Sequence, residues 1–482
     1  MTTAMYDYLL RDYAGKAVGI AEGWEMSPDG KSYTLYIRKG VKFHNGEELT
    51  AHDVAFTLEE ASTPEAEEAD IRDQLESTEV IDDYTMRVFL KEVQPYFWTY
   101  LAFLPGDTGG IVIPEDYITE NGWEYFKRQP IGTGPFKFVS YSPGDSVKYE
   151  AIDSHFRQTA SFKNLTLLLV PEETTRVAML KTGGADAVGI GTDSVPVVEE
   201  AGMSTVILLP VQSIIQYYGV YEDRGKDMPV ADIRVRKALS LAIDRDEINS
   251  SMLYGYLQPP MPPGTHETQG ELDVPYWREA AAEVYRYDPE EAMRLLEEAG
   301  YPEAFEDPTI ELWPITGIVE GAYFTRLALV VQDYWQKVGI TSEIVPTDDA
   351  AYGPLRMETR DDETCDDELV GVAVTEVASW KPMPTRSFRT IFGDEGSCNA
   401  ASASAGKNRE LADLIKSSLA EPDTAKRFEM HARATRMGFD MHIVTVIGAM
   451  PGFAAFGPRL DLESPPADFQ SILQFAEYFK HK

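Results

Sequence analysis

Cysteine and histidine are scarce in this chain of 482 residues, and their scarcity narrows the sites it can build. Two cysteines, Cys365 and Cys398, are too few for a disulfide scaffold and, without histidine, too few for a zinc site. One disulfide between them and two separate thiols fit the sequence equally well. The 7 histidines are scattered, which favours surface or hydrogen-bonded roles over metal ligation. We therefore expect neither a metal ion nor a cofactor.

Basic residues are also few. Lysine and arginine number 43 against 80 acidic residues, which gives a formal net charge of -37. Binding to nucleic acid requires clustered positive charge, so nucleic acid is excluded as a partner. An acidic surface indicates solubility and suits a saline or metal-ion-rich medium. Hydrophobic residues at 43% and aromatic residues at 11% exclude a disordered chain, and the length allows two or three domains.

Long apolar runs are missing as well. No stretch reaches the roughly 18–20 apolar residues that span a bilayer. The nearest, His442–Phe456, is interrupted by a proline, Pro451, and by two glycines, so it predicts a buried strand and a turn. No secretory signal precedes the structured-looking sequence that begins near Tyr6. We expect that an upstream segment was removed or is not included.

The sequence carries none of the common catalytic signatures. It contains no Gly-x-x-x-x-Gly-Lys-Ser/Thr phosphate loop, no Gly-x-Ser-x-Gly elbow, no His-Glu-x-x-His pair and no Cys-x-x-Cys pair. Residues 132–135 look like a phosphate loop, but a strand pattern over Phe136–Ser140 follows them where an anion site needs a helix. The acidic run 361–368 lacks the ligand spacing of a calcium loop, which favours a solvated loop. The sequence therefore favours binding, with an extracellular hydrolase as an alternative.

Strand and helix patterns alternate along the whole chain, which is typical of an α/β protein. Residues Tyr33–Ile37 and Thr85–Leu90 alternate between apolar and polar residues and predict strands. The continuous apolar run Leu165–Val170 predicts a strand buried on both faces. The polar segment Arg224–Ala231, with Gly and Pro, is a candidate linker.

Capping residues mark two helices. Thr50 and Asp53 form a pattern close to a capping box, so a helix is expected to follow. Asp288 precedes a proline and two glutamates, and apolar residues then recur at helical spacing until Gly300. This pattern predicts a helix that starts at Asp288 and ends at Gly300.

The stretch Trp24–Val54 joins a turn, a strand, a second turn and this first capped helix. Its order of residues closely resembles the signature of the family 5 extracellular solute-binding proteins, the peptide/nickel class that serves ABC importers. Five further segments resemble that family's motifs and follow in its order: Pro130–Phe136, Arg176–Asp186, Asp232–Ile248, Tyr287–Tyr301 and Val338–Ile340.

The resemblance implies an α/β, periplasmic-binding-protein-like fold of class II (cluster C), with two lobes, a hinge and an inserted small subdomain. Lobe I would comprise residues 1–40, 131–220 and 447–482, and the inserted subdomain residues 41–130. Lobe II would comprise residues 221–446. Hinge closure of the two lobes would enclose the solute.

The resemblance also implies the role of an extracytoplasmic solute-binding subunit that delivers its ligand to an ABC permease and ATPase complex. We expect a monomer in the periplasm or at the cell surface, tethered through the missing N-terminal segment. The same resemblance places aromatic side chains in the cleft, where each offers a flat apolar area and, in most cases, a polar tip. By position these are Tyr6, Trp98, Tyr217, Tyr218, Trp313, Tyr323 and Trp380.

One of these positions departs from the family pattern. Peptide-binding relatives carry an acidic residue that pairs with the α-ammonium group of the peptide. Aligned on Pro384, that position holds Trp380 in this chain. A buried ammonium without its carboxylate is unfavourable, so a sugar-like or aromatic solute is expected, with a dipeptide or oligopeptide as the alternative. Scattered histidines give little support to nickel or haem.

Overall fold

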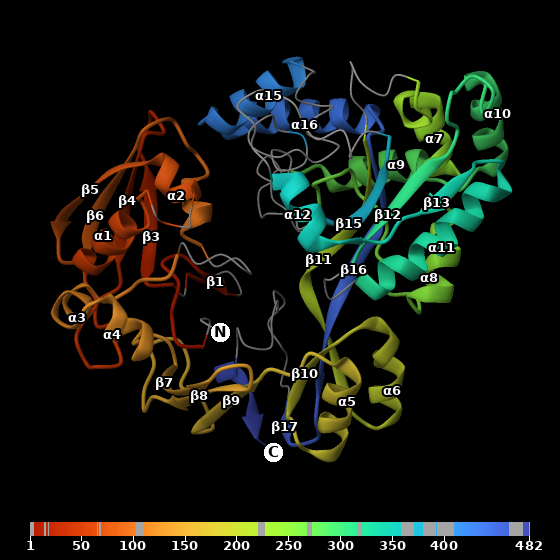
Figure 1. Cartoon of the computed structure of the whole chain (residues 1–482). Helices are drawn as coiled ribbons and strands as arrows, with labels where there is room; N and C mark the ends of the chain where they lie inside the picture. The colour runs from red at the N-terminus through yellow and green to blue at the C-terminus, as the bar shows by residue number, and fades with distance from the viewer. Residues whose placement is uncertain are drawn as a thin grey trace. The chain divides into compact units, whose positions relative to one another are not determined.

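The computed structural model describes residues 4–13, 16–17, 19–64, 66, 69–102, 110–219, 227–267, 272–316, 321–357, 371–378, 392, 409–461 and 476–481. The chain forms two compact units, one of residues 1–210 with 452–482 and one of residues 211–451. It passes between them inside two strands, β11 (Ser204–Tyr218) and β16 (Val444–Phe456) (Figure 1). The family resemblance predicts these passages at 220/221 and 446/447.

The first unit contains the N-terminal strands and most of the short helices. Its helices are α1 (Ala51–Glu60), α2 (Ala69–Gln74), α3 (Glu115–Asn121), α4 (Trp123–Arg128), α5 (Glu173–Thr182) and α6 (Val195–Glu200). Its strands are β1 (Asp12–Tyr13), β2 (Lys16–Ala17), β3 (Ala21–Met26), β4 (Ser32–Ile37), β5 (Leu75–Asp82), β6 (Thr85–Leu90), β7 (Phe136–Ser142), β8 (Ser146–Ala151), β9 (Asn164–Leu168), β10 (Ala187–Ile190), β17 (Leu460–Asp461) and β18 (Lys480–His481).

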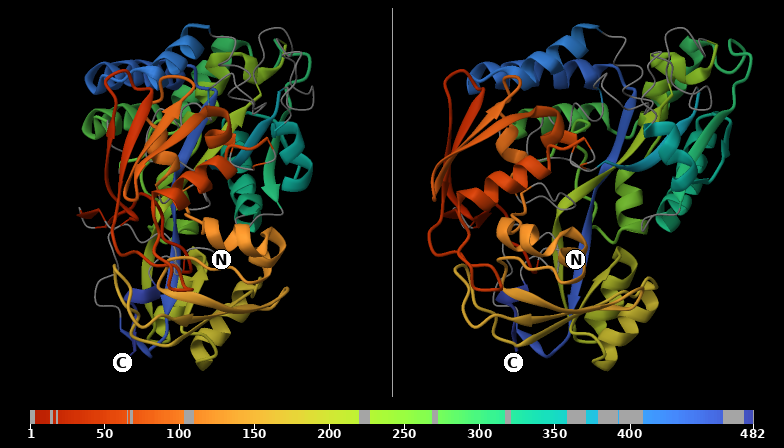
Figure 2. Two further views of the ribbon diagram at one scale, coloured as in Figure 1. Left: turned by 90° about the vertical axis from the view of Figure 1, so that its left-hand side faces the viewer. Right: turned by 60° about the vertical axis from the view of Figure 1, so that its left-hand side comes forward.

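An antiparallel sheet in the order β3-β4-β6-β5 organises the start of this unit. The right-hand view of Figure 2 shows these red and orange strands with helix α1 beside them. The predicted strands over Tyr33–Ile37 and Thr85–Leu90 are confirmed as β4 and β6. The predicted capping box is also confirmed, because Thr50 accepts from the backbone N–H of His52 at 3.2 Å and donates its own N–H to Asp53 at 2.9 Å.

A second sheet, in the order β7-β8-β9, corrects one prediction. The run Leu165–Val170 is not buried on both faces. Strand β9 lies at the edge of the sheet, and the side chains of Leu168 and Leu169 are 45% and 63% exposed. Only Leu165 and Leu167 pack against the apolar core of the unit. An edge strand has one neighbour, so a continuous apolar run does not by itself require two covered faces.

The second unit is built on a mixed sheet. Its helices are α7 (Ile233–Leu241), α8 (Arg245–Met252), α9 (Val274–Val284), α10 (Pro289–Ala299), α11 (Gly321–Lys337), α12 (Asp349–Met357), α15 (Arg409–Ala420) and α16 (Thr424–Asp440). Its further strands are β12 (Ile310–Thr316), β13 (Ser342–Ile344), β14 (Thr347–Asp348) and β15 (Ala373–Ala378). The sheet runs β10-β16-β11-β15-β12-β13, and β14 also pairs with β12. Strands β12, β13, β14 and β15 are parallel, and β11 is antiparallel to β15.

Both faces of this sheet are covered. One core contains Leu312 of β12 and apolar residues from α7, α8, α10 and α11. The other contains Trp313 and Ile315 of β12 and apolar residues from α9, α12, α15 and α16. The helix predicted after Asp288 is confirmed as α10, with Gly300 in the left-handed conformation at its end (φ 76°). Among the described residues, no helix combines the length and apolar character needed to cross a membrane.

The segment before the C-terminus corrects a second prediction. The expected turn near Pro451 is absent, because β16 continues as one strand to Phe456. Gly448 allows close packing of Leu257, since a Cβ at Gly448 would lie 2.6 Å from Cγ of Leu257. Within the candidate linker, the described residues include a short 3-10 helix, η3 (Pro229–Ala231), and residues 224–226 lie outside the described part of the chain.

A buried ionic network joins distant parts of the first unit. The carboxylate of Asp7 accepts hydrogen bonds from Nε of Arg157 at 2.7 Å and from the hydroxyl of Thr133 at 3.0 Å, and it contacts Nε2 of His155 at 3.0 Å. Arg157 also pairs with Glu477. Burial alone would raise the pKa of Asp7, but Arg157 and His155 hold it well below its usual value.

Asp7→Asn should therefore destabilise the protein by about 3–5 kcal/mol, because it leaves Arg157 buried with one carboxylate fewer. Urea unfolding of the variant and the parent chain would measure this loss. Glu124→Gln is the control, since Glu124 forms an exposed pair with Lys127 and should change stability by no more than about 0.5 kcal/mol. Equal effects of the two substitutions would contradict the prediction.

His44 fastens the turn that leads into β7. Its Nδ1 accepts from the N–H of Gly132 at 3.3 Å, and its Nε2 then donates to the carbonyl of Gly134 at 2.9 Å. This turn also pairs with the N-terminal segment: the N–H of Gly134 donates to the carbonyl of Met5 at 2.8 Å. Burial lowers the pKa of His44, so the neutral imidazole is the folded form.

Because the folded pKa of His44 lies below the unfolded value of about 6.5, its contribution to stability is complete above that pH and falls as the solution is acidified. The free energy of unfolding of the parent chain should decline from pH 7 to pH 5, with His44 contributing up to about 1.4 kcal/mol per pH unit. His44→Gln should flatten the profile. His52→Gln, at an exposed position in α1, should not, and parallel profiles for all three proteins would refute the assignment.

Candidate functional site

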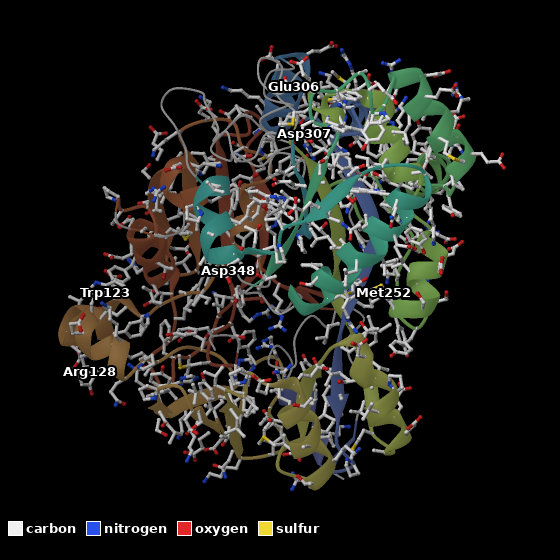
Figure 3. All side chains as sticks on the ribbon, turned by 45° about the vertical axis from the view of Figure 1, so that its right-hand side comes forward. Trp123, Arg128, Met252, Glu306, Asp307 and Asp348 are labelled. Atoms are coloured by element: carbon white, nitrogen blue, oxygen red, sulfur yellow. The ribbon has the colours of Figure 1, made fainter. Side chains whose placement is uncertain are left out.

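The parallel strands of the second unit end at a common edge. Strand β12 ends at Thr316 and β15 at Ala378, and β14 pairs with the end of β12 through Thr316 and Asp348. In open α/β sheets, ligands bind beyond the carboxyl ends of the strands. Figure 3 shows Asp348 well apart from Asp307, which precedes the amino end of β12. We take this carboxyl edge as the candidate site within the second unit.

Polar groups gather at the carboxyl edge. The hydroxyl of Thr316 donates to the carbonyl of Thr347 at 3.2 Å, which leaves its lone pairs as acceptors. Oδ1 of Asp348 accepts from the N–H of Ala350 at 2.9 Å and caps the start of α12. Hydroxyl and carboxylate groups of this kind can orient a small polar ligand by hydrogen bonds.

Two of the predicted cleft residues follow strands that end at this edge. Tyr323 lies in the first turn of α11, after β12, and its ring is 9% exposed and packs edge-on against Phe324 with ring centroids 5.9 Å apart. Trp380 comes two residues after the end of β15 and lies outside the described residues, as do Cys365, Cys398 and the acidic run 361–368. The topology therefore associates Tyr323 with this edge.

Two others lie toward the opposite end of β15. Tyr218 pairs with Ala373, which is roughly 16 Å along the strand from Ala378. Its side chain is fully buried, its hydroxyl lies 3.2 Å from the hydroxyl of Thr445, and burial raises its pKa to about 12. The structure thus makes Tyr218 a core residue. The backbone of Tyr217 pairs with Val374 next to it.

Trp313 belongs to a pocket near the amino ends of the parallel strands. The pocket has a volume of about 430 Å³ and is lined by Met228, Asp307, Thr309, Glu311, Trp313, Glu343, Gly371 and Val372. The indole N–H of Trp313 donates to Glu311 at 2.8 Å, and the indole is 9% exposed. Trp313 therefore lies away from the carboxyl edge. Among the described residues, no group of three or more histidine, cysteine, aspartate or glutamate side chains is arranged to hold a metal ion.

The two predicted cleft residues of the first unit, Tyr6 and Trp98, pack against other residues of that unit. Tyr6 is 6% exposed and covers Gly132 so closely that a Cβ there would lie 2.6 Å from its ring. Burial, and then Tyr149, raise the pKa of the Tyr6 hydroxyl. Trp98 stacks on Trp24 with ring centroids 5.7 Å apart and an angle of 17°. Both rings have protein partners within their own unit.

Thr316 and Asp348 are not among the residues predicted from the sequence. Both are common polar residues, and only their place after parallel strands marks them. That signal requires strand β12, which the sequence analysis did not predict. Its proline, Pro314, argues against a central strand.

Comparison with known proteins gives a consistent result. The family model described as "Bacterial extracellular solute-binding proteins, family 5 Middle" matches residues 18–398. Heme-binding protein A of Haemophilus influenzae is 30% identical over 363 residues, which cover 69% of this chain and 62% of that protein. The dipeptide-binding protein of Escherichia coli is 27% identical over 450 residues, which cover 86% of this chain and 77% of that protein.

A solved structure shares the fold. The crystal structure of NikA from Brucella suis in complex with Fe(III)-EDTA matches with a TM-score of 0.82 at 21% identity, covering 99% of this chain and 94% of that one. The predicted α/β, periplasmic-binding-protein-like fold is confirmed. Because the family model covers most of its length, this chain belongs to the bacterial extracellular solute-binding proteins, family 5.

Proposed function

We propose that the chain is the extracytoplasmic solute-binding subunit of an ABC importer. It captures a small organic solute and delivers it to a membrane permease. The observation that carries this proposal is the family match over residues 18–398. The division into two units supports it, because the chain passes from one unit to the other at 210/211 and at 451/452 and two such passages allow hinge closure on a ligand.

The proposal includes binding without catalysis. The relatives named above are binding proteins, and the sequence carries none of the common catalytic signatures. It also includes a monomer that is tethered to the membrane through an upstream segment and that hands its solute to the permease and ATPase complex. The family description supports an extracellular location.

The ligand class rests on the position of Trp380. A tryptophan in place of the family's acidic residue favours a sugar-like or aromatic solute, because an indole stacks on rings and cannot neutralise an ammonium group. A peptide ligand is the second candidate. The relative from Escherichia coli is a dipeptide-binding protein, and its match covers 86% of this chain.

Thermal-shift screening with sugars, aromatic compounds, peptides and metal ions tests both candidates. A ligand at 100 times its Kd adds roughly 2.7 kcal/mol of stability, which such a screen detects. Stabilisation by a sugar or an aromatic compound is the expected result. Stabilisation by peptides alone would move the ligand to the second candidate. Turnover of the bound compound in a follow-up titration would overturn the binding role.

Thr316→Val tests the carboxyl edge. The substitution keeps the shape of the side chain and removes its acceptor, so the affinity for the compound that stabilises most in the screen should fall about tenfold. Isothermal titration would measure the change. Thr166→Val, at an exposed position of β9 in the other unit, is the control and should bind as the parent chain does. Unchanged affinity in Thr316→Val would remove this edge from the site.

A further inference from the structure

Two buried arginines bind the strand that returns to the first unit, β16, and the segment just before it. Arg236 lies in α7 and Arg245 at the start of α8, and both belong to the segment Asp232–Ile248 that resembles a family motif. Their residues are 6% and 8% exposed. The acceptors of both guanidinium groups are backbone carbonyls and one serine hydroxyl, and no carboxylate of the described residues lies within hydrogen-bonding distance of either.

Arg236 connects the segment before α7 with the segment before β16. Its Nη1 donates to the carbonyls of Val230 at 2.8 Å and Ala231 at 2.9 Å. Its Nε and Nη2 donate to the carbonyl of Met441 at 3.3 and 2.9 Å. Residues more than 200 positions apart are therefore held by one side chain.

Arg245 reaches the strand itself. Its Nε donates to the carbonyl of Val446 in β16 at 3.0 Å. Its Nη1 donates to the carbonyls of Ser240, Ile243 and Tyr285 at 3.1, 3.2 and 2.9 Å. Nη2 donates to the hydroxyl of Ser240 at 3.1 Å. The planar guanidinium group can serve these acceptors at once because its donors have a fixed geometry.

Both arginines are charged although their side chains are buried, which is unfavourable. Burial lowers the pKa of Arg236 and the pKa of Arg245 to about 10, although the nearby carboxylates of Asp232 and Asp244 act in the opposite direction. A buried charge without an ion pair is expensive. A role in fixing the position of the carbonyls that they bind explains why two such charges are buried here.

Other backbone hydrogen bonds hold Ile443, just before β16, and Ala449 of β16 to the second unit. The N–H of Tyr218 donates to the carbonyl of Ile443 at 2.9 Å, and Ala449 exchanges two backbone hydrogen bonds with Gln258 at 2.9 and 3.0 Å. On the first unit's side, Phe453 pairs with Ile190 of β10. The segment Met450–Gly452 lies between the last of these anchors in one unit and this pairing in the other.

The segment Met450–Gly452 is suited to bending. Pro451 has no N–H and cannot donate a ladder hydrogen bond. Gly452 has no side chain, and a Cβ there would make only ordinary contacts, the nearest at 3.6 Å from Leu208. The border between the two compact units falls between these two residues.

We infer that Arg236 and Arg245 are positioning residues: Arg236 holds the segment before β16 and Arg245 holds β16 itself to the second unit, and together they confine its bending to Met450–Gly452. The inference rests on the proposed function, in which solute capture depends on movement at the two passages. It assigns no solute contact to either arginine. Loss of an anchor would let the strand bend over a longer stretch and would widen the range of distances between the units.

The experiment is done without solute, so a negative result for this inference can be distinguished from a failure of the proposed function. Spin labels carried by unnatural amino acids at Val197 and Met293, both 46% exposed and one in each unit, would report the distance distribution by pulsed electron resonance. Hydrogen exchange of peptides over 444–449 would report the anchoring of β16. Arg245→Lys keeps a positive charge and cannot serve every acceptor, so it is the test variant.

Arg427→Lys is the matched control. Arg427 is also 6% exposed and also binds carbonyls of the second unit, those of Glu421 at 2.9 Å and Pro422 at 3.3 Å, away from β16. Arg245→Lys should speed exchange over 444–449 at least tenfold and broaden the distance distribution. Arg427→Lys should do neither. An unchanged distribution in Arg245→Lys, or equal broadening in both variants, would overturn the inference.

Pro451→Gly tests the bending segment without touching an anchor. It should broaden the distance distribution while exchange over 444–449 stays at the parent rate. If Arg245→Lys does not fold, this variant still decides whether β16 bends at Met450–Gly452. A distribution of parent width would place the bending elsewhere and overturn that part of the inference.

Discussion

The organisation of the second unit depends on the backbone carbonyls of one strand, β16, and of the segment before it. They receive the guanidinium groups of Arg236 and Arg245, which come from α7 and α8 more than 200 residues earlier in the chain. Helices α7 and α8 also supply part of one core of the sheet. The same contacts therefore set the packing of the helices and the path of a strand that leaves the unit.

The two units stabilise buried charge in different ways. In the first, Arg157 forms ion pairs with two carboxylates, Asp7 and Glu477, and Thr133 and His155 add contacts to Asp7. In the second, carbonyl dipoles replace the opposite charges. An ion pair depends on two side chains, whereas a carbonyl belongs to the main chain. Arginine bonded to carbonyls thus fixes backbone directly, which suits a strand that must keep its path up to a bending point.

Much of the fold could be predicted because its signals are local. A capping box at Thr50, an aspartate before α10 and a glycine after it each act within one turn of helix, and the structure has all three. The two failures concern information that is not local. The run Leu165–Val170 does not reveal whether a second strand will lie beside it. Likewise, Gly448 and Pro451 predict a turn from the sequence alone. In the structure, Leu257 occupies the space next to Gly448.

The candidate site was harder to predict because aromatic residues serve both cores and binding sites. Tyr218 is a core residue, and Tyr6 covers Gly132, although both were chosen for the same reason as Tyr323. What distinguishes a site in this sheet is the carboxyl end of a parallel strand.

This signal can be used only if β12 is predicted as a strand, and Pro314 argues against that prediction. The structure shows how the strand tolerates its proline. The partner of β12 changes from β13, which pairs as far as Leu312, to β14, which pairs from Ile315. The missing N–H of Pro314 falls at this change, where no pair on that side requires it. The proline that hides the strand in the sequence therefore lies where β14, with Asp348, replaces β13 as the partner of β12.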